Sequence, residues 1–276
     1  MKEKVVFLIG NPIEHSISPK LHNTIFDFLN MKYNYGKRLV RENELREVVE
    51  SFRKSKGLGF NVTIPHKVAI MQYLDEISEE AHAIGAVNTV KYENDKLVGY
   101  NTDCKGFEMQ LVSDGVYIEG KRIKILGAGG AARAVVFALI NAKAKEITIY
   151  NRSLDKARNL CGDLPQITDC KTLQEFEASN CDVIINTTSI GLAPNVEDSP
   201  VCNFAEIESQ TQVVDLIYNP HKTKFMKLAS EYGVPTYNGM KMLVFQAMAA
   251  HDLWFDNNVC DNRELVTRLL EELYEG

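Results

Sequence analysis

Short apolar runs alternate with longer amphipathic segments along most of the chain. Residues 4–10 form the first apolar run, which predicts a buried strand. The segment after it carries Leu21, Ile25, Phe28 and Leu29 at the spacing of one helix face. Strands that alternate with helices in this way are typical of α/β proteins.

The same patterns predict the other elements of the first hundred residues. Ser18 and Pro19 are the residue types that start a helix, with Ser18 as its N-cap. The further elements that we expect are a strand at 33–40, helices at 42–54 and 75–84, and a hairpin with strands at 87–92 and 97–100.

Residues 58–64, L-G-F-N-V-T-I, alternate with period two. This period predicts a strand with one apolar face and an opposite face that carries Asn61 and Thr63. Pro65 ends the strand and begins a helix, so Lys67 lies in the first turn. There the helix dipole modestly favours the neutral amine over the ammonium. A solvated surface lysine is the common alternative.

Residues 122–133, R-I-K-I-L-G-A-G-G-A-A-R, combine a buried strand, a glycine turn and the start of an Ala-rich helix. This order is the first unit of a dinucleotide-binding βαβ motif. Gly127 allows the tight turn, Gly129 lets the backbone approach a pyrophosphate, and Ala132 is small enough for close packing of helix on strand. The helix N-terminus then offers free N–H groups to the phosphates.

The next strand, at residues 146–152, ends in Asn151-Arg152-Ser153 where an NAD site would carry a carboxylate. Arg152 suits a ribose 2′-phosphate and Lys156 adds a second cation, so the pattern favours NADP. Asp155 lies close by and weakens this preference. The alternative is a solvated Arg152 beside a helix cap at Ser153.

Two more buried strands, within residues 182–189 and 212–220, are each followed by a loop where the cofactor crevice of such a sheet lies. A helix at 222–232, a short strand at 234–236 and two closing helices complete the pattern. The first closing helix, at 240–255, is rich in Met and contains Gln246. A Met-rich stripe of this kind is more often core than ligand site.

Two groups of polar residues can each be interpreted in two ways. Ser16 and Ser18 serve turn and capping chemistry, or they offer two hydroxyls at the carboxyl end of a strand, where α/β sheets bind ligands. Asp103 follows the hairpin and either caps the next helix or faces Lys67 across a cleft.

Composition limits the function classes. The chain has 276 residues, a length that favours two domains, and 45% hydrophobic and 25% charged residues, as in ordinary globular proteins. A net charge of -6 argues against a nucleic-acid or anionic-membrane partner, and no apolar run reaches the roughly 18 residues of a membrane span. The six cysteines lack the spacing of a metal site, so we expect free thiols, no metal and a cytoplasmic location.

Eight blocks of the sequence, in order, resemble those of the shikimate dehydrogenase family over essentially the whole chain. They are G-N-P-I-E-H-S-I-S-P, N-V-T-I-P-H-K, G-A-V-N-T, N-T-D-C-K-G-F, G-A-G-G-A-A-R, N-R-S, D-L-I-Y-N-P and Gly239-Met240. Eight blocks in the right order are far more specific than any single one.

The resemblance implies an α/β fold with two domains and a cleft between them. The N-terminal three-layer α/β domain, residues 1–104 and 239–276, would bind substrate, and the Rossmann-type domain, residues 105–238, would bind NADP. The implied activity is the reversible NADPH-dependent reduction of 3-dehydroshikimate to shikimate in aromatic amino acid biosynthesis. We expect a monomer or a homodimer.

The resemblance also implies residue roles. Lys67 and Asp103 match the catalytic pair. The matches to the substrate-binding residues are Ser16, Ser18, Asn61, Thr63, Lys67, Asn88, Asp103, Tyr218 and Gln246. The matches to the cofactor-binding residues are Gly127, Ala128, Gly129, Gly130, Ala131, Asn151, Arg152, Ser153, Lys156, Thr188, Ile217 and Gly239.

The chain departs from the family pattern at two of these blocks. Ser153 stands where the family usually has Thr and keeps the hydroxyl, and Cys104 stands beside Asp103 where many members have Gly. Relatives that oxidise quinate tend to change the second serine of the substrate pair, so the presence of Ser18 favours shikimate.

Two alternatives stay open. One is a broader quinate/shikimate dehydrogenase that uses NAD or NADP, with Asp155 admitting NAD. The other is a non-catalytic ligand-sensing protein on the same scaffold. A sensor has no need for both Lys67 and Asp103, so their presence in the sequence argues against it.

Overall fold

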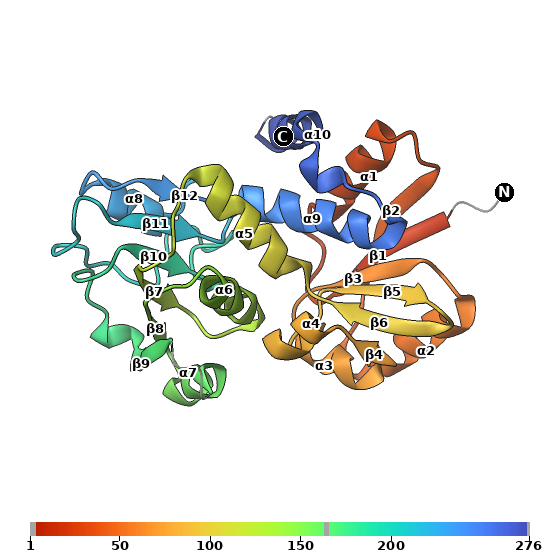
Figure 1. Cartoon of the computed structure of the whole chain (residues 1–276), viewed down its shortest axis with the longest axis horizontal. Helices are drawn as coiled ribbons and strands as arrows, with labels where there is room; N and C mark the ends of the chain where they lie inside the picture. The colour runs from red at the N-terminus through yellow and green to blue at the C-terminus, as the bar shows by residue number, and fades with distance from the viewer. Residues whose placement is uncertain (1–3, 163–165, 275–276) are drawn as a thin grey trace. The chain divides into compact units, whose positions relative to one another are not determined.

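The computed structural model describes residues 4–162 and 166–274, and the chain divides into two compact units. Unit 1 consists of Met1–Gly106 and Leu243–Gly276, and unit 2 is Phe107–Met242. The unit boundaries therefore fall inside the helices α5 (Thr102–Asp114) and α9 (Met240–Phe255), beside the boundaries at 104 and 239 that the sequence predicts (Figure 1).

Unit 1 contains a mixed sheet of six strands in the order β2-β1-β3-β5-β6-β4. β1 pairs in parallel with β2 and β3, whereas β3, β5 and β6 pair antiparallel. The strands are β1 (Lys4–Gly10), β2 (Tyr33–Leu39), β3 (Gly59–Val62), β4 (Glu76–Ile77), β5 (Thr89–Glu93) and β6 (Lys96–Tyr100). The predicted hairpin is confirmed, and its turn residues Asn94 and Asp95 both have positive φ, as tight hairpin turns require.

Helices cover both faces of this sheet, which gives the three layers expected from the sequence (Figure 1). On one face Val6 and Leu8 of β1 pack against Phe26 and Trp254 of α1 and α9. On the other face β1 and β3 pack against α2. The helices are α1 (Ser18–Phe28), α2 (Leu45–Ser55), α3 (His66–Ala69), α4 (Glu79–Ile84), α9 and α10 (Arg263–Tyr274), with short 3₁₀ turns at Glu42–Glu44, Ile70–Tyr73 and Val259–Asp261.

Unit 2 contains an all-parallel sheet in the order β12-β11-β10-β7-β8-β9, which is the doubly wound order of the Rossmann fold. Its strands are β7 (Arg122–Leu126), β8 (Glu146–Asn151), β9 (Ile167–Thr172), β10 (Val183–Asn186), β11 (Gln212–Asp215) and β12 (Thr236–Tyr237). The strand order reverses between β7 and β10, and such a switch point is where these sheets bind ligands.

The helices of unit 2 follow its strands as the sequence predicts. α6 (Gly130–Asn141) follows β7, α7 (Leu154–Cys161) follows β8, and α8 (Lys224–Ser230) lies between β11 and β12. Phe225 and Met226 of α8 pack in one cluster with Leu126 and Val213 of the sheet. A 3₁₀ turn at Leu173–Glu175 follows β9.

Two expectations about local structure are wrong, and one strand has no counterpart among the predicted elements. The polar helix expected at 75–84 begins only at Glu79, because Glu76 and Ile77 pair with β6 instead. The apolar face expected for 58–64 does not include Ile64, since β3 ends at Val62 and Ile64 is 65% exposed. The polar strand β9 was not expected at all.

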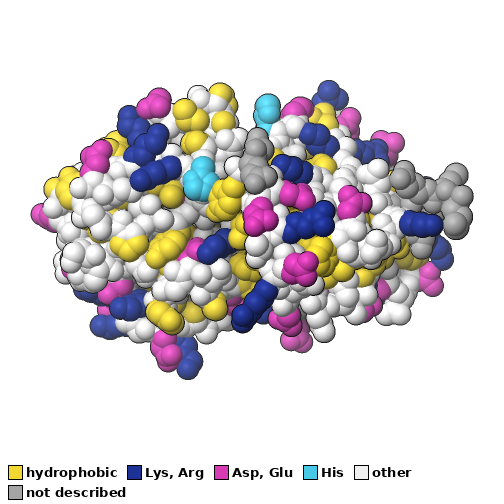
Figure 2. All heavy atoms as spheres, turned by 90° about the horizontal axis from the view of Figure 1, so that it is seen from above, with side chains coloured by type: hydrophobic (Ala, Val, Ile, Leu, Met, Phe, Trp, Pro, Cys, Tyr) yellow, Lys and Arg dark blue, Asp and Glu magenta, His cyan; other side chains and the backbone are white. Residues whose placement is uncertain are grey.

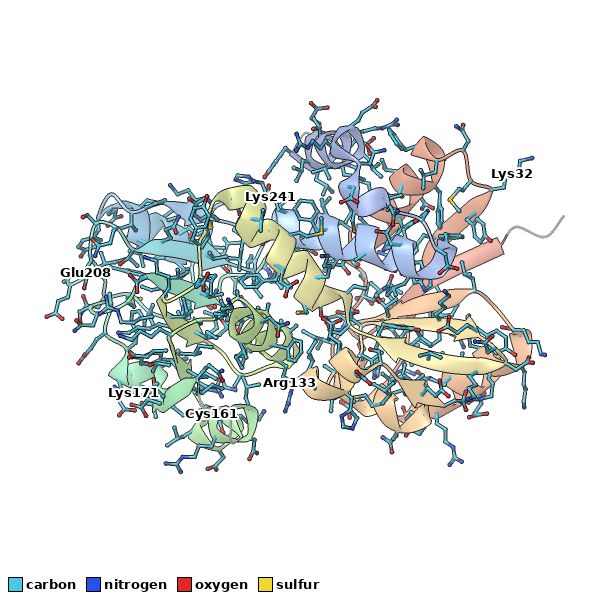
Figure 3. All side chains as sticks on the ribbon, viewed as in Figure 1. Lys32, Arg133, Cys161, Lys171, Glu208 and Lys241 are labelled. Atoms are coloured by element: carbon cyan, nitrogen blue, oxygen red, sulfur yellow. A yellow bond between two sulfur atoms is a disulfide. The ribbon has the colours of Figure 1, made fainter. Side chains whose placement is uncertain are left out.

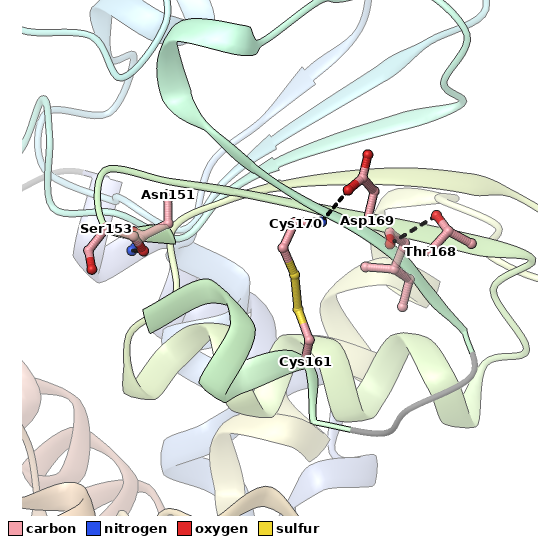
Figure 4. The surroundings of a disulfide bond; sticks show 7 residues. Asn151, Ser153, Cys161, Thr168, Asp169 and Cys170 are labelled. Carbon is pink, nitrogen blue, oxygen red and sulfur yellow. Dashed lines mark hydrogen bonds between the residues drawn. A yellow bond between two sulfur atoms is a disulfide. The ribbon is translucent and has the colours of Figure 1, made fainter. Parts of the chain in front are cut away.

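The cysteines also differ from expectation. Cys161, at the end of α7, forms a disulfide with Cys170 of β9 (Figure 4). Cys104, Cys181, Cys202 and Cys260 are thiols outside any disulfide, as expected. The prediction of free thiols is therefore wrong for this pair. The fold brings the end of α7 against β9, and the spacing of the two cysteines in the sequence does not indicate that they would meet. Figure 3 places Cys161 and Lys171 on neighbouring segments of unit 2.

Acidic and basic side chains are interspersed on the face drawn in Figure 2. Among the described residues, none of the helices has the length and apolar character needed to cross a lipid bilayer.

Candidate active site

Lys67 and Asp103 form an ion pair in unit 1. Lys67 Nζ lies 2.5 Å from Asp103 Oδ2, and the two side chains are 16% and 9% exposed. Lys67 lies on α3, which has only four residues and therefore few peptide dipoles to sum. The expected dipole effect on Lys67 is thus minor, and the main electrostatic partner of the amine is the Asp103 carboxylate.

Asp103 lies in the first turn of α5 and does not cap it. The side-chain oxygen of Asn101 instead accepts hydrogen bonds from the backbone N–H groups of Asp103 and Cys104, at 3.0 and 3.3 Å. The capping interpretation of Asp103 is wrong because the helix starts earlier than expected, at Thr102. The Asp103 carboxylate is therefore available to other side chains.

Asn88 holds the second oxygen of this carboxylate. Its Nδ2 donates to Asp103 Oδ1 at 2.9 Å, and its Oδ1 accepts from the backbone N–H of Thr102 at 2.8 Å. Asn61, on β3, donates through Nδ2 to the backbone oxygen of Asn88 at 3.2 Å. Both amides are buried, so the predicted residues Asn61, Asn88, Lys67 and Asp103 form one hydrogen-bonded group.

Ser16 and Ser18 lie next to each other at the start of α1. Ser16 Oγ donates to Ser18 Oγ at 3.2 Å and accepts from the backbone N–H of Ser18 at 3.3 Å. The N-cap position belongs to Ile17, with no capping bond from a side chain, so the prediction that Ser18 caps the helix is wrong. Both side chains are partly exposed after β1.

The remaining predicted substrate residues lie on three other segments. Thr63 follows β3 and is partly exposed, and Gln246 lies on α9, where its Nε2 donates to the backbone oxygen of Leu243 at 2.9 Å. Tyr218 belongs to unit 2, after β11, and burial raises its pKa. Their substrate contacts stay predictions.

The glycine turn follows β7 at the switch point of the unit 2 sheet. Gly127 has a φ of +109°, and a Cβ there would lie 2.6 Å from Thr187 Oγ1, so a larger residue would disturb the turn. A Cβ at Gly129 would meet no atom within 4 Å, which leaves open space at the N-terminus of α6. Ala132 is fully buried, as predicted for packing of helix on strand. These features fit a bound pyrophosphate.

The loop between β8 and α7 carries the predicted phosphate clamp. Asn151 Nδ2 donates to the backbone oxygen of Ser153 at 2.8 Å. Ser153 occupies the N-cap position of α7 but makes no capping bond with its side chain (Figure 4). Arg152 and Lys156 are exposed, and within the described residues neither has a salt bridge, so both cations suit an external phosphate.

A buried carboxylate, which the sequence pattern does not mark as a site residue, holds the loops after β10 and β11. Asp215 Oδ1 accepts from Asn186 Nδ2 at 2.9 Å and from the backbone N–H of Ile217 at 3.0 Å. Asn186 in turn accepts from the hydroxyl of Thr188 at 2.7 Å. Asp215 thus fixes the segments of two predicted cofactor residues, Thr188 and Ile217.

Burial raises the pKa of Asp215 to about 6, against the lowering effect of its hydrogen bonds to Thr223, Ile217 and Asn186. The only signal of this residue in the sequence is its place in the block D-L-I-Y-N-P. Position 239 requires glycine, because a Cβ there would lie 2.0 Å from the backbone oxygen of Leu216 in the same region.

Comparison with known proteins agrees with this arrangement. Residues 8–90 match the family model of the shikimate dehydrogenase substrate binding domain, and residues 110–222 match that of shikimate / quinate 5-dehydrogenase. A shikimate dehydrogenase (NADP(+)) of Methanococcus maripaludis is 43% identical over 258 residues, which cover 92% of each chain. The chain belongs to the shikimate dehydrogenase family.

Solved structures of this family share the fold of the whole chain. A chorismate mutase/shikimate 5-dehydrogenase fusion protein from Clostridium acetobutylicum aligns with a TM-score of 0.91 at 38% identity, covering 100% of this chain and 98% of that one. The Thermus thermophilus shikimate 5-dehydrogenase in complex with NADP(H) and shikimate aligns with a TM-score of 0.85 at 30% identity, covering 96% and 99%.

Proposed function

We propose that this member of the family is an NADP-dependent shikimate dehydrogenase that interconverts 3-dehydroshikimate and shikimate on the route to aromatic amino acids. The observation that carries the proposal is the largely buried ion pair of Lys67 and Asp103. It supplies a proton donor and a carboxylate in one place, as reduction of a ketone to an alcohol requires.

In the reducing direction negative charge develops on the carbonyl oxygen of 3-dehydroshikimate. Lys67 donates a proton from Nζ to that oxygen, and Asp103 holds the amine in line with it. In the oxidising direction Lys67 accepts the hydroxyl proton of shikimate. The two groups lie 2.5 Å apart, so the carboxylate is close enough to orient the amine in both directions of the reaction.

The cofactor residues of the proposal all lie at the carboxyl ends of strands in unit 2. When bound, NADP supplies the hydride chemistry of the reaction. The turn at Gly127, Ala128, Gly129, Gly130 and Ala131 would hold the pyrophosphate through backbone N–H groups. Asn151, Arg152, Ser153 and Lys156 would hold the 2′-phosphate, and the segments of Thr188, Ile217 and Gly239 would line the nicotinamide half.

The substrate residues of the proposal lie mainly in unit 1. The Ser16 and Ser18 hydroxyls suit the substrate carboxylate as hydrogen-bond donors. Thr63, Asn61, Asn88 and Gln246 would surround the ring hydroxyls, and Tyr218 is a further proposed substrate residue. The oligomeric state, monomer or homodimer, and a cytoplasmic location belong to the same proposal.

The test is steady-state oxidation of shikimate and of quinate, each with NADP and with NAD, followed by absorbance of the reduced cofactor. We expect strong turnover with shikimate and NADP and weak turnover with the other three pairs. Comparable turnover with quinate or NAD would replace the proposal with the broader quinate/shikimate dehydrogenase. Asp155 supports that second candidate, because it is exposed in the first turn of α7 beside Arg152.

A folded protein that binds shikimate but turns over none of the pairs would point to the ligand-sensing alternative. The Lys67–Asp103 pair argues against this outcome, since a protein that only binds its ligand gains nothing from burying a proton-transfer pair.

A further inference from the structure

A line of hydrogen bonds runs through unit 1 and ends on Asp103. It begins at Tyr35 on β2, whose hydroxyl donates to Asn61 Oδ1 at 2.7 Å. Asn61 Nδ2 donates to Thr89 Oγ1 at 2.9 Å. The first three members therefore lie on three strands of one sheet, β2, β3 and β5.

The line continues from Thr89 to the proposed catalytic pair. Thr89 Oγ1 donates to Asn88 Oδ1 at 2.9 Å, and Asn88 Nδ2 donates to Asp103 Oδ1 at 2.9 Å. Between Tyr35 and Asp103 each member accepts from the one before it and donates to the one after it. The Thr102 hydroxyl is a side branch, at 2.9 Å from Asn88 Nδ2 and 3.2 Å from Thr89 Oγ1. Hydrogen bonds in such a series polarise one another, and in a buried network each depends on the next.

The first member of the line is fixed by packing. Tyr35 is 2% exposed, and its ring stacks on His22 with centroids 4.0 Å apart and an interplanar angle of 3°. The ring of Trp254 also lies near the ring of Tyr35, with centroids 6.5 Å apart. Burial raises the pKa of Tyr35 well above its usual value, so the phenol keeps its proton and remains a donor.

We infer that Tyr35 is a positioning residue for the proposed proton transfer. Its hydroxyl holds the oxygen end of the Asn61 amide in place, and through Thr89 and Asn88 it holds the donor that keeps Asp103 opposite Lys67. The inference rests on the proposed function, because it assigns Tyr35 an effect on a step that Lys67 and Asp103 carry out.

The Asn61 amide is held at both of its ends. Its two hydrogens are donated to Thr89 and to the backbone oxygen of Asn88, which can only accept, so this end carries the nitrogen. The Tyr35 hydroxyl donates to the oxygen at the other end. Without that hydroxyl a buried acceptor loses its donor and the amide shifts, which weakens the bonds that lead through Thr89 and Asn88 to Asp103.

The first test is Tyr35→Phe, which removes the hydroxyl and keeps the ring that stacks on His22. We expect kcat for shikimate oxidation to fall about 3- to 10-fold with KM for NADP unchanged, because one buried hydrogen bond is lost. KM for shikimate should rise by a smaller factor than kcat falls, since Asn61, the partner of Tyr35, is itself a proposed substrate residue. The control is Tyr92→Phe, which removes a tyrosine hydroxyl bonded to Asp95 at the exposed hairpin of the same sheet.

A double-mutant cycle with Thr89→Val tests the route. Thr89→Val breaks the middle of the line with little change of side-chain volume. If Tyr35 acts through Thr89, the double variant loses no more kcat than the larger single loss. Additive losses, or a rise in KM for shikimate in place of the fall in kcat, would overturn the inference.

A measurement without turnover separates this inference from the proposed function. The ¹³C resonance of the Asp103 carboxyl carbon, assigned with Asp103→Asn, should shift in Tyr35→Phe and in Thr89→Val and stay in place in Tyr92→Phe. An unshifted resonance in Tyr35→Phe would overturn the inference even if the wild-type protein oxidises shikimate. A wild type without turnover but with the shifted resonance would instead reject the proposed function alone.

Discussion

At the scale of single residues, the environment of Lys67 decides what its loss should do. Lys67→Ala removes the proton donor and leaves the substrate contacts of the serines in place, so we expect kcat to fall roughly 10²- to 10⁴-fold with a small change in KM. Steady-state oxidation of shikimate at saturating NADP measures this.

Lys91→Ala is the matched control for Lys67→Ala. Lys91 is also only 13% exposed and also pairs with carboxylates, those of Glu93 and Asp256, but it belongs to the hairpin. Its replacement should leave kcat within about twofold, since Lys91 and its two partners lie outside the hydrogen-bonded group of Lys67 and Asp103. Near-normal kcat in Lys67→Ala would remove Lys67 from the proton transfer.

Arg152 is the residue on which cofactor choice should depend. Its guanidinium is exposed at the start of α7, so Arg152→Ala removes a charge-assisted contact to the 2′-phosphate and little packing. We expect KM for NADP to rise about 10- to 100-fold and KM for NAD to change far less. Arg158→Ala, in the last turn of the same helix, is the control. Equal losses for NADP and NAD would contradict the clamp.

The roles of residues could be predicted from the sequence where a motif fixes the backbone conformation. They could be predicted less well at helix starts, where an error of one residue assigns the cap to the wrong side chain. The turn at Gly127 and the packing of Ala132 follow from the motif alone. Ser18 and Asp103 were candidate caps, but each helix starts so that another residue takes that position. Tyr35 gave no signal, because its partner Asn61 is 26 residues away in the chain.

At the scale of elements, the Cys161–Cys170 disulfide ties α7 to the edge strand β9 (Figure 4). Cys170→Ser should lower the free energy of unfolding by about 2–3 kcal/mol, the value expected from loop-closure entropy for a short loop. Because α7 also carries Lys156, we expect a modest rise in KM for NADP and none in KM for shikimate. Urea denaturation followed by far-ultraviolet circular dichroism measures the first effect.

Two comparisons control the disulfide experiment. Cys202→Ser replaces an exposed free cysteine of the same unit and should leave the unfolding midpoint unchanged. Wild-type protein in dithiothreitol should match Cys170→Ser. If reduction leaves both the midpoint and KM for NADP unchanged, the disulfide does not brace α7.

The elements of the parallel sheet could be predicted because their apolar runs are buried on both faces. β9 could not, since its sequence I-T-D-C-K-T is polar and it lies at the sheet edge, where only β8 pairs with it. β4 could not be predicted either, because it has only two residues and exists through its pairing with β6. The disulfide was missed for a related reason, because nine residues of separation carry no spacing signature.

At the scale of the whole molecule, the buried histidines of unit 1 and the buried Asp215 of unit 2 should make stability depend on pH with opposite signs. Burial lowers the pKa of His251 to about 3 and that of His22 well below its usual value, the latter with a contribution from the His251 charge. These histidines stay neutral in the folded state and take up protons only on unfolding. Their contribution to the stability of unit 1 is therefore present above about pH 6.5 and is lost as pH falls.

The only tryptophan, Trp254, makes this measurable for unit 1 alone, since it lies 6.1 Å from His251 between ring centroids. Below pH 6.5 the free energy of unfolding from tryptophan fluorescence should fall by about 1.4 kcal/mol per pH unit for each buried histidine. His251→Leu should remove about half of this slope. His82→Leu, at an exposed histidine of α4, should leave it intact, and an unchanged slope in His251→Leu would contradict the account.

Asp215 gives unit 2 the opposite dependence. Its pKa of about 6 lies above the unfolded value of 3.8, so its contribution to stability is present below about pH 4 and is lost as pH rises to about 6. Asp215→Asn should abolish this loss, because the amide oxygen still accepts from Ile217 and the amide nitrogen donates to Thr223. Hydrogen exchange of the β10 and β11 amides against pH measures it.

Asp182 is the control within the same unit. Burial raises its pKa, but hydrogen bonds and the charge of Arg122, together with Lys121, outweigh burial and lower it. In the wild type, the contribution of Asp182 to stability is therefore lost as pH falls, whereas that of Asp215 is lost as pH rises. Asp182→Asn should remove the Asp182 contribution. If Asp215→Asn keeps the wild-type dependence between pH 4 and 6, the buried carboxylate is not the group that titrates there.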